Sequence, residues 1–207
     1  MSKTKGRIIT ASLVAAVALT TGGAYLFELP PFEGVGDIEA GDVCENLGPP
    51  DKAVPAIREM APPEPSYSFV EQKNQGSVDF FFSGCSGRTE NSEFLITRTE
   101  PTMLGNSTFE SWSSGPASKM VETENPKNFD RFNTAADTWG VVSKRKAAIV
   151  TPCFSHGHQG LTTIVLLRSS AEPERTADRY RQELIDLAIG TAEFAHKDAG
   201  CTLPFKV

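Results

Sequence analysis

The residues best suited to chemistry are two histidines separated by a single glycine, His156 and His158. On a loop between two strands, imidazoles at this spacing can point the same way and bind zinc or copper. A metal site needs a third and usually a fourth ligand, and no Asp, Glu or free Cys lies near them in the sequence. We therefore interpret this segment as a solvated loop with His156 and His158 as weak candidate metal ligands, and we assign no cofactor and no catalytic residue.

Residues 84–87, Gly-Cys-Ser-Gly, superficially resemble the glycine-framed serine of some hydrolases. The nucleophile elbow of those enzymes needs glycine two residues before and two residues after the serine, and Arg88 occupies the second of these positions. We therefore interpret this segment as a turn. The sequence contains neither GxxxxGK nor GxGxxG, so nucleotide binding has no support.

The chain has four cysteines, which can form two disulfides in an oxidising compartment. They are Cys44, Cys85, Cys153 and Cys201. None belongs to a CxxC pair, which argues against a zinc knuckle or a thioredoxin-type site. Three pairings are possible. We favour Cys44–Cys85 with Cys153–Cys201, because each closes a loop of about 40–50 residues and stabilises the fold by roughly 3–4 kcal/mol in the chain-entropy model.

Among the elements that must position these residues, the first is a basic N-terminus followed by an apolar run. Residues 1–7 contain three basic residues and no acid, and residues 8–27 are twenty residues without a charge. A helix of that length spans roughly 30 Å, the thickness of the hydrocarbon core of a membrane. The positive-inside rule then predicts a cytoplasmic tail at 1–7, a single transmembrane signal-anchor at 8–27 and an extracellular location for everything after it.

A cleavable signal peptide is the alternative for this segment, because it also has a basic start and an apolar middle. Residues 22–24, Gly-Gly-Ala, are small enough for cleavage, and the product would be secreted without residues 1–24. We favour the uncleaved anchor because the apolar run exceeds the usual core of 7–15 residues.

The part of the chain after the anchor is acidic. Residues 28–43 contain two prolines, three glycines and five acids, which is typical of an extended linker, so residues 44–207 are expected to form one disulfide-stabilised domain. Beyond the basic tail, 17 Lys and Arg face 26 Asp and Glu, a net charge of −9. Such a surface repels phosphate backbones, so we predict no nucleic-acid partner.

Two β-hairpins are predicted from alternating and β-branched residues. The first joins 77–85 to 92–99, and the second joins 147–154 to 161–169. In both hairpins the first strand runs to a cysteine, which suggests two related halves with equivalent cysteines. A further strand is expected near 107–113.

A long amphipathic helix is predicted to close the chain, from Pro173 in its first turn to a stop at Gly200. Its apolar stripe consists of Tyr180, Leu184, Leu187, Ala188, Thr191 and Ala195. A shorter helix is expected over 51–60. The sequence therefore predicts an α+β fold, with an antiparallel sheet packed on one face against the C-terminal helix.

Three segments carry a resemblance: CENL after the linker, TWGVVSKRKAAIVTPC before the second hairpin and LAIGTAEFAHKDAGC at the end. With the basic start and apolar span, they resemble uncharacterised membrane-anchored or secreted proteins of high-GC actinobacteria such as streptomycetes. The resemblance covers most of residues 44–203. It implies the same location, disulfides and fold, and it supplies no catalytic residue.

The expected function is a non-enzymatic binding module of the cell envelope. Anchored through residues 8–27, it would offer the free sheet face or the 101–140 region to an envelope protein or a cell-wall polymer. The alternative is an envelope hydrolase or metal-dependent enzyme, which would place His156 and His158 in a pocket facing a carboxylate. A ligand-sensing domain, recognisable by a closed apolar cavity, is a third class.

Overall fold

The computed structural model of the protein describes residues 34–74, 78–104, 129–132, 134, 138–154, 159–168 and 177–207. The predicted anchor at 8–27 and the expected strand at 107–113 lie outside these ranges. Across the ranges given, no helix is long and apolar enough to cross a membrane.

The chain divides into two compact units. The larger unit comprises Asp37–Pro62 and Tyr67–Val207, and the smaller one comprises Met1–Gly36 and Pro63–Ser66. Among the described residues of the smaller unit, the N–H of Gly36 donates to the carbonyl of Glu64 at 2.9 Å. All elements described below belong to the larger unit.

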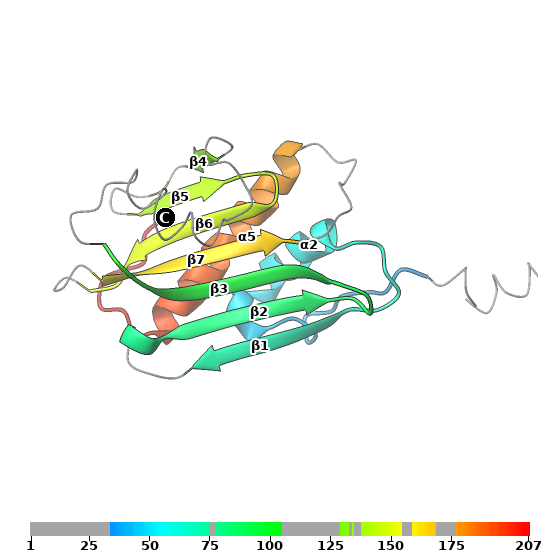
Figure 1. The fold of residues 1–207 in the computed structure, drawn as a ribbon, viewed down its shortest axis with the longest axis horizontal. Helices are drawn as coiled ribbons and strands as arrows, with labels where there is room; N and C mark the ends of the chain where they lie inside the picture. Colours follow the sequence, from blue (N-terminus) through cyan, green and yellow to red (C-terminus); the bar gives the residue numbers. More distant parts are fainter. Residues whose placement is uncertain are drawn as a thin grey trace, which may run out of the picture. The chain divides into compact units, whose positions relative to one another are not determined.

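In the described part of the chain, seven antiparallel strands form one sheet, in the order β1-β2-β3-β7-β6-β5-β4 (Figure 1). Their bounds are β1 Ser68–Asn74, β2 Phe82–Arg88, β3 Glu93–Met103, β4 Asp130–Phe132, β5 Trp139–Val142, β6 Lys146–Pro152 and β7 Gln159–Leu167. The hairpins β2–β3 and β6–β7 confirm the predicted antiparallel strands. The two hairpins meet in the middle of the sheet, where β3 pairs with β7.

Residues 84–87 lie within β2, so their interpretation as a turn is wrong. The glycines of this segment serve packing instead. A Cβ on Gly87 would lie 3.0 Å from both the Phe69 and the Phe94 rings, so glycine lets these rings pack closely against the strand. The reversal comes later, where the Thr89 N–H donates to the Ser92 carbonyl at 2.8 Å.

The two hairpins are not equivalent at their cysteines. Cys85 lies in the middle of β2, opposite Thr97, whereas Cys153 follows the last residue of β6. The suggested relation between two halves therefore fails at the position that motivated it.

Two helices, α2 Pro50–Met60 and α5 Ala177–Asp198, cover one face of the sheet (Figure 1). The 3₁₀ turns η1 Glu45–Leu47 and η2 Val78–Phe80 complete the described elements. The predicted stripe of α5 faces the core, with every described member at most 2 % exposed; these are Leu184, Leu187, Ala188, Thr191 and Ala195. The side chain of Tyr180 lies outside the described part.

The core between helices and sheet also includes Ile38, which is 2 % exposed. This residue falls within 28–43, the segment assigned to an extended linker, so at this point the linker contributes to the domain. Arg58 of α2 holds the segment: its Nε donates to the Ile38 carbonyl at 2.9 Å, and its Nη2 lies 2.8 Å from Asp37 Oδ1.

The other face of the sheet carries a second apolar cluster. Its buried members are Val141, Ala148, Val150 and Ile164. They lie on this face because side chains alternate along a strand and the residues next to them in sequence belong to the core under the helices. Trp139 packs against this cluster. Over β5–β7, the sheet face expected to lie open toward a partner is therefore buried.

Two disulfides join Cys44 to Cys85 and Cys153 to Cys201, the pairing that the loop lengths favoured. They indicate an oxidising, extracytoplasmic environment.

Candidate functional site

A pocket of about 530 Å³ opens between the start of α2, the second half of α5 and the C-terminal tail. Its lining residues are Glu45, Gly48, Pro49, Pro50, Gly190, Glu193, Phe194, His196, Lys197 and Phe205. This volume is within the range of small-ligand sites.

Helix α5 supplies the floor of the pocket. Gly190, Glu193, Phe194 and Lys197 are spaced three and four residues apart, so they share one side of the helix. Because the apolar stripe of α5 faces the sheet, this side is turned away from the core. The packing of the helix therefore orients the floor of the pocket.

Residues 45–50 form the first wall of the pocket. Three sets of interactions fix the beginning of this segment to β1 and β2. The Cys44–Cys85 disulfide ties the segment to β2. Asn46, which is fully buried, donates from Nδ2 to Ser83 Oγ at 3.0 Å and to the Gly84 carbonyl at 2.8 Å. The Glu45 N–H donates to Glu71 Oε2 at 3.1 Å.

This wall approaches α5 closely at a pair of glycines. Gly48 has φ 93° and ψ −160°, a conformation that is essentially restricted to glycine. A Cβ on Gly48 would lie 2.8 Å from the Gly190 carbonyl oxygen, and one on Gly190 would lie 3.2 Å from the Leu47 carbonyl oxygen. Glycine is therefore required at 48, and at 190 it lets the wall approach the helix without a backbone shift of a few tenths of an ångström.

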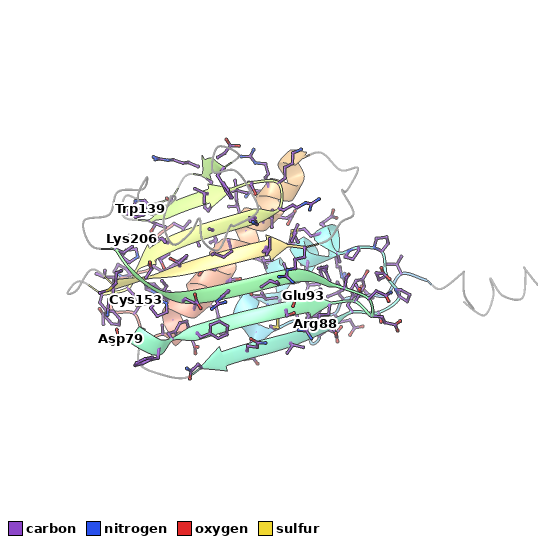
Figure 2. The ribbon with its side chains drawn as sticks, in the orientation of Figure 1. Asp79, Arg88, Glu93, Trp139, Cys153 and Lys206 are labelled. Atoms are coloured by element: carbon purple, nitrogen blue, oxygen red, sulfur yellow. A yellow bond between two sulfur atoms is a disulfide. The ribbon has the colours of Figure 1, made fainter. Side chains whose placement is uncertain are left out.

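The C-terminal tail forms the second wall. The Cys153–Cys201 disulfide ties it to the end of β6, which Figure 2 shows near the end of α5. The N–H groups of Thr202 and Leu203 both donate to the Cys153 carbonyl, at 3.0 and 3.1 Å. Farther along, Thr138 Oγ1 donates to the Lys206 carbonyl at 2.9 Å, which leaves Phe205 between two fixed points.

His196 lies at the base of this wall and is 5 % exposed. Its Nε2 is 3.2 Å from the Pro152 carbonyl oxygen, which can only accept, so Nε2 carries the proton and Nδ1 of the neutral ring carries a lone pair. Burial lowers the pKa of His196, and the bond to Pro152 opposes this effect. The Phe205 ring packs edge-on against the imidazole with centroids 5.5 Å apart.

The rim of the pocket carries three exposed charges: Glu45, Glu193 and Lys197. Among the described residues, neither Glu193 nor Lys197 has an ion-pair partner within 4.0 Å. By contrast, Lys73 beside the pocket is paired: its Nζ lies 2.8 Å from Asp198 Oδ1 and 5.4 Å from the centre of the Phe194 ring.

The candidate metal ligands of the sequence, His156 and His158, lie outside the described residues. Within the described ranges, no group of three or more His, Cys, Asp or Glu side chains could hold a metal ion.

The serine of the hydrolase-like segment, Ser86, contacts two charged residues of β2 and β3, Arg88 and Glu93, which are labelled in Figure 2. Ser86 Oγ donates to Glu93 Oε1 and accepts from Arg88 Nε at 3.1 Å. Glu93 Oε2 in turn lies 3.0 Å from Arg168 Nη1. Among the residues that the structure describes, no histidine contacts this serine, and the hydrogen bonds and ion pairs of the cluster link β2, β3 and the end of β7.

The sequence analysis assigned no role to His196 and did not find the rest of the pocket. One signal was present: Gly190 lies in the interior of α5, where glycine costs about 1 kcal/mol relative to alanine and usually has a packing reason. Phe205 had no such signal, because a single aromatic residue in a tail carries no pattern.

No family model, curated protein or solved structure matches the chain.

Replacing Gly48 by alanine is expected to lower the free energy of unfolding by about 1–3 kcal/mol, because alanine cannot relax into this backbone conformation. Gly41→Ala is the matched control, since nothing lies within 4 Å of its added Cβ. Urea denaturation of both variants measures the difference. Equal stability of the two variants would contradict the glycine contact between wall and helix.

His196 predicts a pH dependence of stability. Its folded-state pKa lies below the ordinary value of 6.5, so the unfolded chain binds more protons. Stability from this residue is therefore complete above pH 6.5 and is lost as the pH falls below it. In His196→Gln, where the amide can still donate to Pro152, the slope of unfolding free energy against pH should be smaller by at most about 1.4 kcal/mol per pH unit. Identical slopes would show that the imidazole is not desolvated.

Proposed function

We propose that this chain is a membrane-anchored binding module of the cell envelope and that the pocket on α5 is its binding site. Three features support the anchor and its orientation: the basic residues at 1–7, the uncharged run at 8–27 and the acidic composition that follows. The two disulfides support an oxidising location for the domain.

The observation that carries the binding role is that each disulfide holds one wall of the same pocket. Cys44 immediately precedes the wall at 45–50, and Cys201 precedes the tail that positions Phe205. A pocket whose walls are fixed before binding loses little conformational entropy when a ligand enters. The two disulfides thus favour the binding of a ligand in this pocket.

The pocket and the start of the larger unit lie at opposite ends of α2. Residues 37 and 38 contact Arg58 near the end of α2, whereas the pocket includes Pro50 at its start. The helix has 11 residues and is therefore about 16 Å long. Within the larger unit, the pocket therefore lies at the opposite end of α2 from residues 37 and 38.

The lining matches a recognition site in composition. Two phenylalanine and two proline rings supply apolar surface, while two carboxylates and one ammonium group lie at the rim. Specific sites commonly combine apolar walls with a few polar groups that fix orientation. The partner is expected to be an exposed part of an envelope protein.

In-cell photo-crosslinking tests this function. A photoreactive residue at Glu193 of the full-length chain should give a reproducible adduct in intact cells of the source organism. The same substitution at Asp186, an exposed position two turns earlier on α5, should not. Digestion of protoplasts with an impermeant protease should remove the adduct, because the domain lies outside. No adduct at 193, or equal adducts at both positions, would contradict the proposal.

A further inference from the structure

We infer that the pocket takes an organic cation carried on an apolar stem, of the kind that a lysine side chain of a partner polypeptide presents. This inference rests on the proposed binding function and names the chemistry of its ligand.

The apolar part of such a ligand fits the rings that line the pocket. Pro49 and Pro50 lie on one side, and Phe194 and Phe205 lie on the floor and the opposite wall. A lysine stem of four methylene groups buries its carbons along apolar surface while its charged end reaches the rim.

The charges of the rim favour a cation. Glu45 and Glu193 offer two carboxylates against the single ammonium of Lys197. Glu71, whose Oε2 accepts from the Glu45 N–H, adds a third carboxylate nearby. Lys73 and Asp198 cancel each other as an ion pair. The local balance is therefore negative, as is that of the whole domain, and it attracts cations from solution.

The Phe194 ring already takes part in a cation–π contact with Lys73, at 5.4 Å from its centre. The ring is thus in an environment where a positive charge is stabilised. Aromatic rings beside carboxylates are a general arrangement for binding alkylammonium groups.

The start of α2 and the end of α5, which both border the pocket, also favour a positively charged ligand. The start of α2 would normally favour an anion through its free N–H groups. Here Pro49 and Pro50 occupy the first positions, and proline has no N–H to donate. Glu193 and Lys197 lie in the final turns of α5, where the carbonyl ends of the peptide groups favour a cation.

Lys197 gives the inference a test of sign. Lys197 is the one ammonium group among the lining residues, where the other basic side chain, His196, is a buried neutral imidazole, so Lys197 opposes a cationic ligand. Removing its charge should strengthen binding of a cation, whereas removing the charge of Glu193 should weaken it. A pocket that takes an anion gives the opposite pair of results, and a purely apolar site responds to neither change.

The experiment titrates the full-length protein in detergent micelles with three blocked tripeptides, using calorimetry at low salt. They are acetyl-Leu-Lys-Leu-amide, acetyl-Leu-Gln-Leu-amide and acetyl-Leu-Glu-Leu-amide. The lysine peptide should bind most tightly. Glu193→Gln should raise its Kd about two- to fivefold and Lys197→Gln should lower it by a similar factor, the range for exposed charge pairs. Kd for the glutamine peptide should not change.

Two variants serve as controls for the change in net charge. Asp186→Asn lies on the same helix outside the pocket, and Lys144→Gln is exposed between β5 and β6. Neither should change the Kd of the lysine peptide. Equal or tighter binding of the glutamate peptide, no binding of the lysine peptide at millimolar concentration, or equal effects of pocket and control variants would overturn the inference. An adduct at position 193 in cells together with any of these results would leave the binding function standing and reject only the cationic ligand.

Discussion

The packing of α5 on the sheet is the contact on which the rest of the larger unit depends. Leu184, Leu187 and Ala188 are buried against the strands, and this fixes the rotation of the helix about its axis. Once the rotation is fixed, Gly190 and Phe194 must lie on the other side. The same helix therefore closes the core with one face and forms the floor of a pocket with another.

Covalent links then determine the walls. The core holds α5 in place, but the short turn at 45–47 and the tail after Gly200 belong neither to a long helix nor to the sheet. Each is joined by a disulfide to the sheet, at Cys85 and Cys153. Each disulfide restricts its segment in the unfolded chain too, so less conformational entropy is lost when the segment becomes ordered in the folded domain. The carboxylates at the rim of this preformed pocket favour a positively charged ligand over a negatively charged one.

The sequence was sufficient for the elements whose burial has a clear period. The final helix, the helix at 51–60 and both hairpins could be predicted, because apolar residues there recur every 3.6 or 2 positions. Strand β1 was missed because most of its side chains are exposed and give no alternation. The pairing of β3 with β7, and the presence of Pro50 and Phe205 in the lining of one pocket, bring distant parts of the chain together, and no local pattern encodes such long-range arrangements.

Two neighbouring residues of α5 test its orientation most directly. Ala192 is 1 % exposed in the core, whereas Glu193 faces the pocket rim. The free energy of unfolding should fall by about 3–5 kcal/mol, or folding should fail, for Ala192→Glu, which buries an unpaired carboxylate. It should change by less than about 0.5 kcal/mol for Glu193→Ala. Tolerance of glutamate at 192, or an equal loss at 193, would mean that α5 presents a different face to the sheet.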